Sequence, residues 1–355
     1  MSLSELIAPT RRLAFVGLAK NTGKTETLTC ALRELQETGC TVGVTSVGRD
    51  GEERDAIDIR IEKPRIDLPA WSLVATTGPL LRASAVPHEA LVHTEMRTPL
   101  GRVVVARLLA RGSVELAGPS AAEDVRAVVE AMLAHSAEQV LIDGAADRRA
   151  ASSPAVSDGL VMSTGAVLHE EIEQVVARTR DAVDLVRLAD VSDRSEIGRR
   201  IRAIAESQRG NVLVGEPHDE PVALRPRFGL TGTAYEVGML LHANPAAHHL
   251  VLRGAVCESF LRGLTRAARG RELQVTVADS TKVFLLRRGC KWFERQGISI
   301  RVLAPIRLRA LTVNPLAPQS HSFDSRRLRA LLQEAIPDVP ILDVRDHAHE
   351  LVTAA

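Results

Sequence analysis

The stretch GLAKNTGKTETL, residues 17–28, decides how the first half of the chain folds. The run RLAFVG at residues 12–17 is short and apolar, as expected for a buried strand that ends in glycine. From Leu28 to Leu35, apolar residues recur at helical spacing, and the run CTVGVTSVG at residues 40–48 predicts a second strand. This order predicts a βαβ unit whose loop lies at the carboxyl end of the first strand.

The loop is similar to a phosphate-binding loop whose glycines are displaced. The usual pattern is G-x-x-x-x-G-K-[ST]. Gly23, Lys24 and Thr25 match its end, but the first glycine is due at position 18, and Gly17 comes one residue early. Glycine at 23 lets backbone N–H groups approach phosphate, Lys24 supplies charge, and Thr25 can ligate Mg²⁺. The sequence therefore predicts a site for ATP and Mg²⁺, and the lack of an NKxD signature favours ATP over GTP.

Neighbouring residues extend this predicted nucleotide-binding set. Only five residues of the chain are lysines, and two of them, Lys20 and Lys24, lie in this stretch. Lys20 is a candidate second cation for phosphate, with a solvated loop lysine as the alternative. Asn21 and Thr22 stand where glycines are usual, and asparagine tolerates left-handed backbone better than most residues. Glu26, in the first turn of the predicted helix, completes the set.

A phosphate loop needs an acidic partner for Mg²⁺ and water. In EQVLIDGAADRR, residues 138–149, an apolar strand ends in Asp143 and is followed by glycine, which is the Walker-B arrangement. In TSVGRDGEERD, residues 45–55, Asp50 follows the second strand, with an acidic surface turn as the alternative. We therefore expect Lys24, Asp143 and Asp50 to be catalytic and Thr25, Asp50 and Asp143 to hold the magnesium ion.

Other segments predict the rest of the first domain. Ser120 and Glu123 predict a capping box for the helix that precedes the Asp143 strand. Short strand-like runs between residues 65 and 117 predict either further strands of a mixed sheet or an inserted β-element. Several polar residues between positions 147 and 158, Asp158 among them, are candidates to face the γ-phosphate.

New α/β signals begin at residue 211 and carry no phosphate loop of their own. We therefore expect an α/β protein with a phosphate-loop NTPase domain over residues 1–210, built on a mostly parallel sheet. A second, smaller α/β domain is expected over residues 211–355. Residues 190–210 predict a connecting helix, and ISIRVLAPIRLRALTVNP, residues 298–315, predicts one long strand region.

The composition excludes several classes of protein. Hydrophobic residues at 45% and charged residues at 25% are typical of a soluble globular chain. A net charge of +1 and 3% aromatic residues argue against direct nucleic-acid binding. The start MSLSELIAPTRR lacks the apolar core of a signal peptide, and no apolar run is long enough to span a bilayer. The four cysteines form no CxxC pair, so we expect a cytoplasmic protein without membrane contact.

Six segments, taken in order, carry a resemblance over nearly the whole chain. They are VGLAKNTGKTETL, TSVGRDGEERD, EKPRI, TPLGRVVVARLLARGSVELAGPS, VLIDGAADRRAASSPAVSDGLVMSTGA and LTVNPLAPQSHSFD. The chain resembles the KamB subunit of the lysine aminomutase reactivase, a P-loop protein. The resemblance implies that Gly23, Lys24 and Thr25 bind nucleotide and that Asp50 and Asp143 are partners of Mg²⁺ or water.

The same resemblance implies partners. A KamC-type, MutS-like ATPase would work beside this chain. Together they would reactivate an adenosylcobalamin- and pyridoxal-phosphate-dependent aminomutase of the lysine 5,6-aminomutase type after its cobalamin is inactivated. The chain is rich in arginine and alanine, unlike the lysine-rich members of the family, so a mutase for another amino acid stays open. A homodimer also stays open.

A function from a different class is the alternative. The phosphate loop, the acidic segment after the second strand and the DGA strand also resemble dethiobiotin-synthetase-like ATP-dependent ligases. Such an enzyme would phosphorylate a small carboxylate or amine, and the second domain would hold that substrate. Stimulation of ATP turnover by a small molecule or by a mutase separates the two hypotheses.

Overall fold

The computed structural model describes residues 2–48, 65–144, 149–207, 211–216, 219–224, 234–318 and 320–345. The chain divides into two compact units. Unit 1 comprises residues 1–180 and 307–355, and unit 2 comprises residues 181–306. The predicted boundary between residues 210 and 211 is wrong, because the chain from residue 307 onward returns to the sheet of unit 1.

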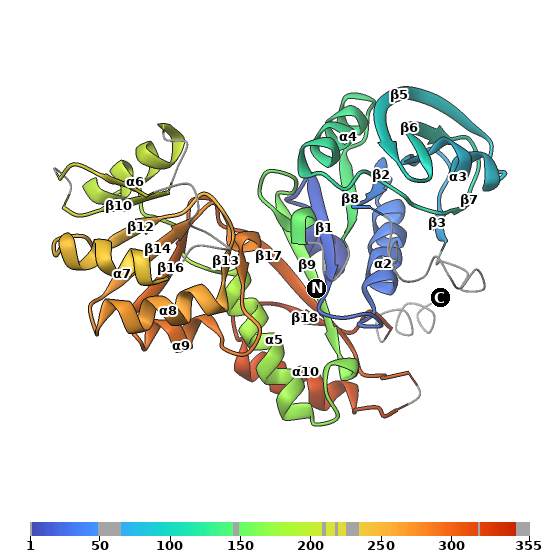
Figure 1. Ribbon diagram of the computed structural model, residues 1–355. Helices are drawn as coiled ribbons and strands as arrows, with labels where there is room; N and C mark the ends of the chain where they lie inside the picture. Colours follow the sequence, from blue (N-terminus) through green and yellow to red (C-terminus); the bar gives the residue numbers. More distant parts are fainter. Residues whose placement is uncertain are drawn as a thin grey trace. The chain divides into compact units, whose positions relative to one another are not determined.

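Unit 1 is built on a large, mostly parallel sheet (Figure 1). Within the described residues its strand order is β18 (Ile341–Leu342), β17 (Leu308–Asn314), β9 (Gly159–Gly165), β1 (Arg12–Gly17), β8 (Gln139–Gly144), β2 (Val42–Ser46), β4 (Leu73–Thr77), β6 (Gly101–Leu108) and β5 (His88–Thr98). Every neighbouring pair from β18 to β4 is parallel, whereas β6 runs antiparallel to both β4 and β5.

The strand-like runs between residues 65 and 117 mostly extend this sheet. β4 continues its parallel part, and β6 and β5 form an antiparallel edge. β3 (Ile66–Leu68) pairs separately with β7 (Gly112–Val114). Of the two alternatives, a mixed sheet therefore describes most of this segment.

Helices cover both faces of the sheet. Val42 and Val44 of β2 belong to the same core cluster as Leu28 of α2 (Lys24–Glu37). Gly43, between those two valines, faces α4 (Ala122–Ala134): a Cβ there would lie 2.7 Å from the Sδ of Met132. Because successive residues of a strand face opposite sides, α2 and α4 lie on opposite faces.

The start of α4 differs from the prediction. Its N-cap is Ala121, and no side chain caps it, so the expected capping box from Ser120 and Glu123 is wrong. The apolar stripe of α4 is buried as its helical spacing requires: Val125, Val128, Val129 and Met132. Burial of this stripe against the sheet fixes α4 without the cap.

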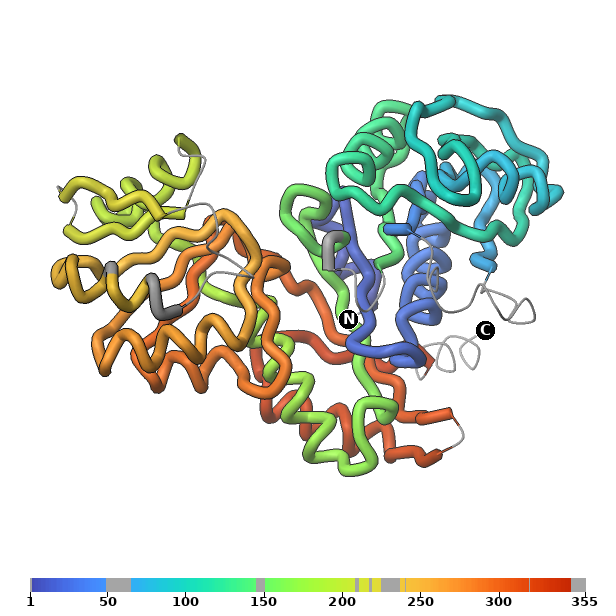
Figure 2. Tube along the Cα trace, viewed as in Figure 1, coloured from blue at the N-terminus to red at the C-terminus, as the bar shows by residue number. Residues whose placement is uncertain are grey.

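The C-terminal part of unit 1 lies beside its N-terminal part. Figure 2 shows β17, near the red end of the colour scale, next to β9 and close to the blue β1. α5 (Ile172–Val186) packs on β9 through a hydrogen bond of 2.6 Å between the hydroxyls of Thr164 and Thr179. α10 (Ser325–Ala335) begins at Asp324, whose side chain accepts a hydrogen bond from the backbone N–H of Arg327. The short helix α1 (Leu3–Ile7) packs on α2 through the same core.

Unit 2 has its own smaller sheet. Its strand order is β11 (Val222–Leu224), β10 (Asn211–Val214), β12 (His249–Val251), β14 (Leu273–Val277) and β16 (Ile298–Val302), while β13 (Val256–Cys257) pairs with β15 (Val283–Phe284). β12, β14 and β16 are parallel, and β10 is antiparallel to both neighbours. Its helices are α6 (Glu196–Ser207), α7 (Ala234–Ala243), α8 (Glu258–Ala268) and α9 (Cys290–Glu294).

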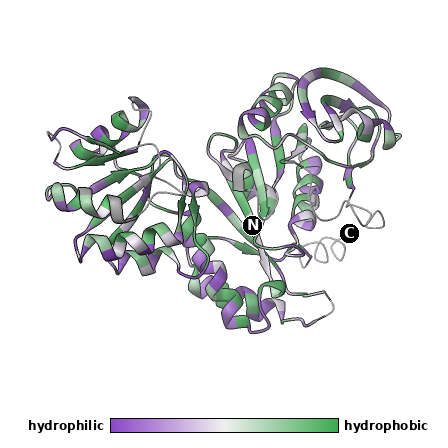
Figure 3. Ribbon diagram, viewed as in Figure 1, coloured by the Kyte–Doolittle hydropathy of each residue, from purple (hydrophilic) through white to green (hydrophobic). Residues whose placement is uncertain are grey.

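Two sequence predictions for this region need correction. The expected connecting helix is α6, and it is part of unit 2 because Ile201 and Ile204 are buried against Val212 and Val214. The expected long strand over residues 298–315 is two strands, β16 and β17, in different sheets. Both strands have apolar residues at most of their positions, as the hydropathy colouring of Figure 3 indicates, so composition alone does not separate them. No helix within the described ranges is long and apolar enough to cross a membrane.

Candidate functional site

The loop between β1 and α2 lies where several parallel strands end. In the sheet register, Val16 pairs with Gly144 of β8, and Gly17 pairs with Ser163 of β9. Asp143 pairs with Ser46, the last residue of β2. The loop therefore starts at the carboxyl edge of the sheet, which is where open α/β sheets bind their ligands.

The position of Gly17 has a steric cause. A Cβ at this residue would lie 2.5 Å from the hydroxyl oxygen of Thr22 and 3.1 Å from the carbonyl oxygen of Ala19. Thr22 is buried, and its hydroxyl donates to that carbonyl at 3.0 Å. The loop thus folds back on its own first residue, so the glycine is required at 17 rather than at 18.

Two further residues of the loop adopt left-handed backbone. Gly23 has φ of 84° and is the N-cap of α2, and Asn21 has φ of 65°. Glycine adopts this region without strain, and asparagine tolerates it, as expected from the sequence. The first backbone N–H groups of a helix have no partner within the helix and carry partial positive charge. The loop therefore ends at the N-terminus of α2, whose partial positive charge favours a bound anion.

Lys24 and Asp143 meet at this helix end. The Nζ of Lys24 lies 3.0 Å from Oδ1 of Asp143 and donates a hydrogen bond of 2.8 Å to the carbonyl oxygen of Gly144. Both side chains are largely buried, with 13% and 18% of their surfaces exposed. An ion pair with so little solvent around it is screened weakly, so each group holds the other in position. Lys24 comes from α2 and Asp143 from β8, in the helix and the strand that the sequence predicted for them.

Asn314, which the sequence analysis did not select, supports the loop from β17. Its side-chain amide donates a hydrogen bond of 2.8 Å to the carbonyl oxygen of Asn21, and its Oδ1 accepts from the N–H of Leu316 at 3.1 Å. Its Cβ also approaches closely enough that a Cβ on Gly23 would lie 3.3 Å away. An asparagine followed by proline at the end of an apolar strand was the available signal.

Hydroxyl groups connect the same strands beneath the loop. Thr27 of α2 and Ser163 of β9 each lie 2.8 Å, oxygen to oxygen, from Thr312 of β17. Thr27 also donates to the carbonyl oxygen of Gly23 at 3.0 Å. The first turn of α2 is therefore tied to β9 and β17 through side chains that are all buried.

The remaining predicted site residues are placed as follows. Lys20 is exposed on the loop, and Thr25 is half-buried in the first turn of α2. Glu26 is exposed and forms an ion pair with Arg345, whose Nε lies 3.0 Å from the carboxylate. Asp50 lies outside the described residues.

Asp158 does not lie near the loop. Its carboxylate pairs with Arg12, the first residue of β1, whereas the loop follows the last residue of that strand. Burial acts to raise the pKa of Asp158, but hydrogen bonds from Arg12 outweigh it and lower that pKa. The suggested place near the γ-phosphate is therefore wrong for Asp158, which fixes the start of β1 instead.

In comparisons with known proteins, no protein-family model, no curated protein and no solved structure matches the chain. The loop, the helix N-terminus and Lys24 together can bind an oxyanion of the phosphate type. The hydroxyl of Thr25 and the carboxylate of Asp143 are oxygen donors of the kind that Mg²⁺ takes. These donor groups fit a nucleoside triphosphate with its magnesium ion.

Proposed function

We propose that unit 1 binds and hydrolyses ATP as the P-loop subunit of a reactivating chaperone. The observation that carries the nucleotide part is the placement of Lys24 beside Asp143 at the N-terminus of α2. The chaperone part rests on the resemblance to the KamB subunit. Its client would be an adenosylcobalamin- and pyridoxal-phosphate-dependent aminomutase, its partner a MutS-like ATPase of the KamC type, and its compartment the cytoplasm.

The residues of the loop divide the work between binding and hydrolysis. Backbone N–H groups of the loop and of the first turn of α2 bind phosphate oxygens. When nucleotide binds, Lys24 pairs with phosphate instead of with Asp143. Thr25 and Asp143 hold the magnesium ion, and Asp143 orients water. When bound, ATP supplies the reactive anhydride bond and Mg²⁺ neutralises phosphate charge. The Lys24–Asp143 pair keeps both side chains ordered before nucleotide enters.

Replacing Lys24 by alanine tests the nucleotide site. We expect Lys24→Ala to lose ATP affinity while the fold survives, measured by calorimetry with Mg²⁺ and by the thermal midpoint. Lys282→Ala is the matched control, because Lys282 is an exposed lysine of unit 2 and its loss changes the net charge equally. Unchanged ATP affinity in Lys24→Ala would show that the loop does not bind phosphate.

The role of hydrolysis is tested with a partner enzyme. We expect slow basal turnover, on the order of or below the 1–10³ s⁻¹ usual for metabolic enzymes, which rises when inactivated aminomutase and the second ATPase subunit are added. Mutase activity should return only with ATP, Mg²⁺ and fresh adenosylcobalamin, and not with Lys24→Ala. Strong stimulation by one small amino or carboxylic acid without a mutase, with a phosphorylated or ligated product, would instead favour the ligase.

A further inference from the structure

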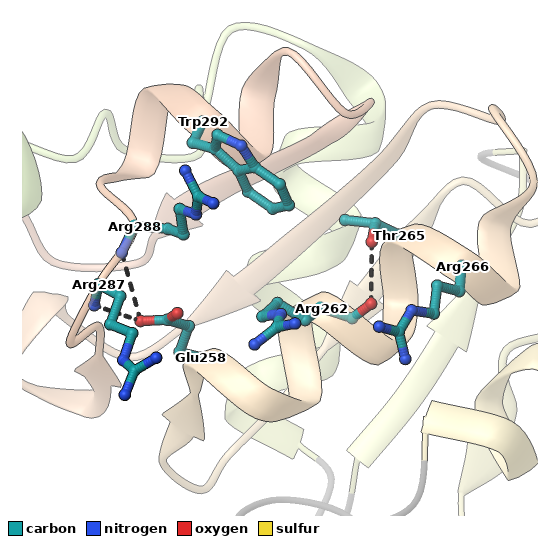
Figure 4. Close-up of a pocket in the computed structure, with 7 residues that line it drawn as sticks. All are labelled: Glu258, Arg262, Thr265, Arg266, Arg287, Arg288 and Trp292. Atoms are coloured by element: carbon teal, nitrogen blue, oxygen red, sulfur yellow. Dashed lines mark hydrogen bonds between the residues drawn. The ribbon is translucent and has the colours of Figure 1, made fainter.

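Unit 2 contains a pocket of about 550 Å³ lined mostly by basic side chains (Figure 4). Arg262 and Arg266 come from α8, Arg287 and Arg288 from the segment after β15, and Trp292 from α9. The volume lies in the range of sites for small molecules. All the residues that line the pocket belong to unit 2.

A buried carboxylate organises one wall of the pocket. Glu258, the first residue of α8, accepts hydrogen bonds of 2.7 Å from the backbone N–H groups of Leu286 and Arg287 and one of 3.4 Å from that of Arg288. Figure 4 shows the bonds from Arg287 and Arg288. Burial acts to raise the pKa of Glu258, yet these hydrogen bonds and the charge of Arg262 outweigh it and lower that pKa. Glu258 therefore stays ionised and holds in place the segment that carries Arg287 and Arg288.

The positive charge of the pocket exceeds what Glu258 neutralises. Four guanidinium groups surround one carboxylate, and among the described residues none of the four has a carboxylate within ion-pair distance. Like charges gathered around one pocket repel each other, and a bound anion relieves that repulsion. The guanidinium fork matches the oxygens of phosphate in particular.

Trp292 gives the pocket an aromatic side. Its ring centroid lies 4.9 Å from that of Phe293 in an edge-to-face arrangement of 87°, and the guanidinium carbon of Arg288 lies 5.2 Å from its centroid. Figure 4 shows Arg288 beside the indole and Arg262 and Arg266 along α8 on the facing side. The aromatic and the cationic walls therefore face one common space.

We infer that this pocket binds a small phosphorylated organic molecule, with its phosphoryl group on the arginines and its organic part against Trp292. The site is independent of the proposed ATP site and gives unit 2 a ligand of its own. An acidic peptide would use the same charges, but the limited volume and the single aromatic wall favour a small molecule.

Fluorescence of Trp292 provides the test. The chain has two tryptophans, so Trp71→Phe leaves Trp292 as the reporter, and Lys24→Ala in the same protein removes the loop lysine on which the proposed ATP site depends. We expect saturable quenching by inorganic pyrophosphate and by adenosine monophosphate at matched ionic strength, and none by adenosine. This result would stand even if the loop of unit 1 proved not to bind ATP, so the two proposals fail separately.

Arginine variants assign the response to the pocket. Arg262→Gln and Arg266→Gln should each weaken binding of both phosphate probes by roughly tenfold, the value of one charged hydrogen bond. Arg253→Gln is the matched control, because Arg253 is exposed in unit 2 and does not line the pocket. The inference is overturned if neither probe quenches, if adenosine or a poly-glutamate peptide acts alone or equally well, or if Arg253→Gln weakens binding as much.

Discussion

Replacing Gly17 by alanine tests the steric account of the loop. The new Cβ would lie 2.5 Å from the hydroxyl oxygen of Thr22, whereas ordinary contacts to a Cβ begin at 3.4 Å. Thr22 is only 1% exposed, so its hydroxyl has no solvent-filled space into which it can withdraw. Relief of the clash therefore requires the whole loop to shift, and with it the N-terminus of α2.

The magnitude follows from the cost of overpacking. Adding a methyl group to a filled site costs roughly 1–3 kcal/mol, so we expect Gly17→Ala to lower the free energy of unfolding of unit 1 by about 2 kcal/mol. Thr22→Ala alone removes one hydrogen bond and one buried methyl group, each worth about 1 kcal/mol, and should cost about 2 kcal/mol. In the double variant the methyl group occupies the space of the lost hydroxyl, so the two effects should couple favourably by roughly 1–2 kcal/mol.

Urea unfolding followed by circular dichroism measures these values, with each transition fitted separately because two units can unfold independently. ATP affinity, measured by calorimetry, should fall in Gly17→Ala and recover in the double variant with Thr22→Ala. Thr22→Ser is the control, because serine keeps the hydroxyl oxygen and should rescue neither quantity. The reasoning is refuted if Gly17→Ala is as stable as the parent, or if the serine variant rescues as well as the alanine variant.

Three further outcomes are expected. Asp143→Asn should keep nucleotide bound but slow hydrolysis, at a cost of about 2–4 kcal/mol in transition-state stabilisation; single-turnover rates as fast as the parent's would move the metal role to another acid. The ion pair with Arg12 lowers the folded-state pKa of Asp158, so its stabilisation is present above the ordinary aspartate pKa and is lost as the pH falls through the folded value. Asp158→Asn should therefore destabilise unit 1 by up to about 1 kcal/mol near neutral pH and by less in acid, and urea midpoints that are equal at neutral pH would contradict this. Burial raises the pKa of Cys30 and of Cys290 to about 12, so both thiols should react with iodoacetamide far more slowly in the native than in the unfolded protein near pH 8; equal rates, read by mass spectrometry, would contradict that burial.

The local parts of the fold could be predicted from the sequence. β1 and α2 follow from apolar periodicity within about two dozen residues. The division into units could not, because it depends on which sheet each strand joins. β16 and β17 are both short apolar strands, and only the pairing of β17 with β9 places it in unit 1.

The site was predictable to the same limit. Lys24 and Asp143 were found because each sits at the end of an element whose type was clear from its own segment. Asn314 was missed because its contact with Asn21 joins residues at opposite ends of the chain. The ion pair between Glu26 and Arg345 was not predicted for the same reason, because the two residues are far apart in the sequence.

Because β17 pairs with β9, the sheet of unit 1 is completed only late during synthesis on the ribosome. β9 is complete by residue 165, but its neighbour β17 begins at Leu308, after all of unit 2 has been made. Until then β9, whose residues are all buried in the finished protein, is an open sheet edge of the kind that pairs with other chains. Translation that stops after unit 2 would therefore release a chain with a complete second unit, an aggregation-prone edge and a loop without the support of Asn314.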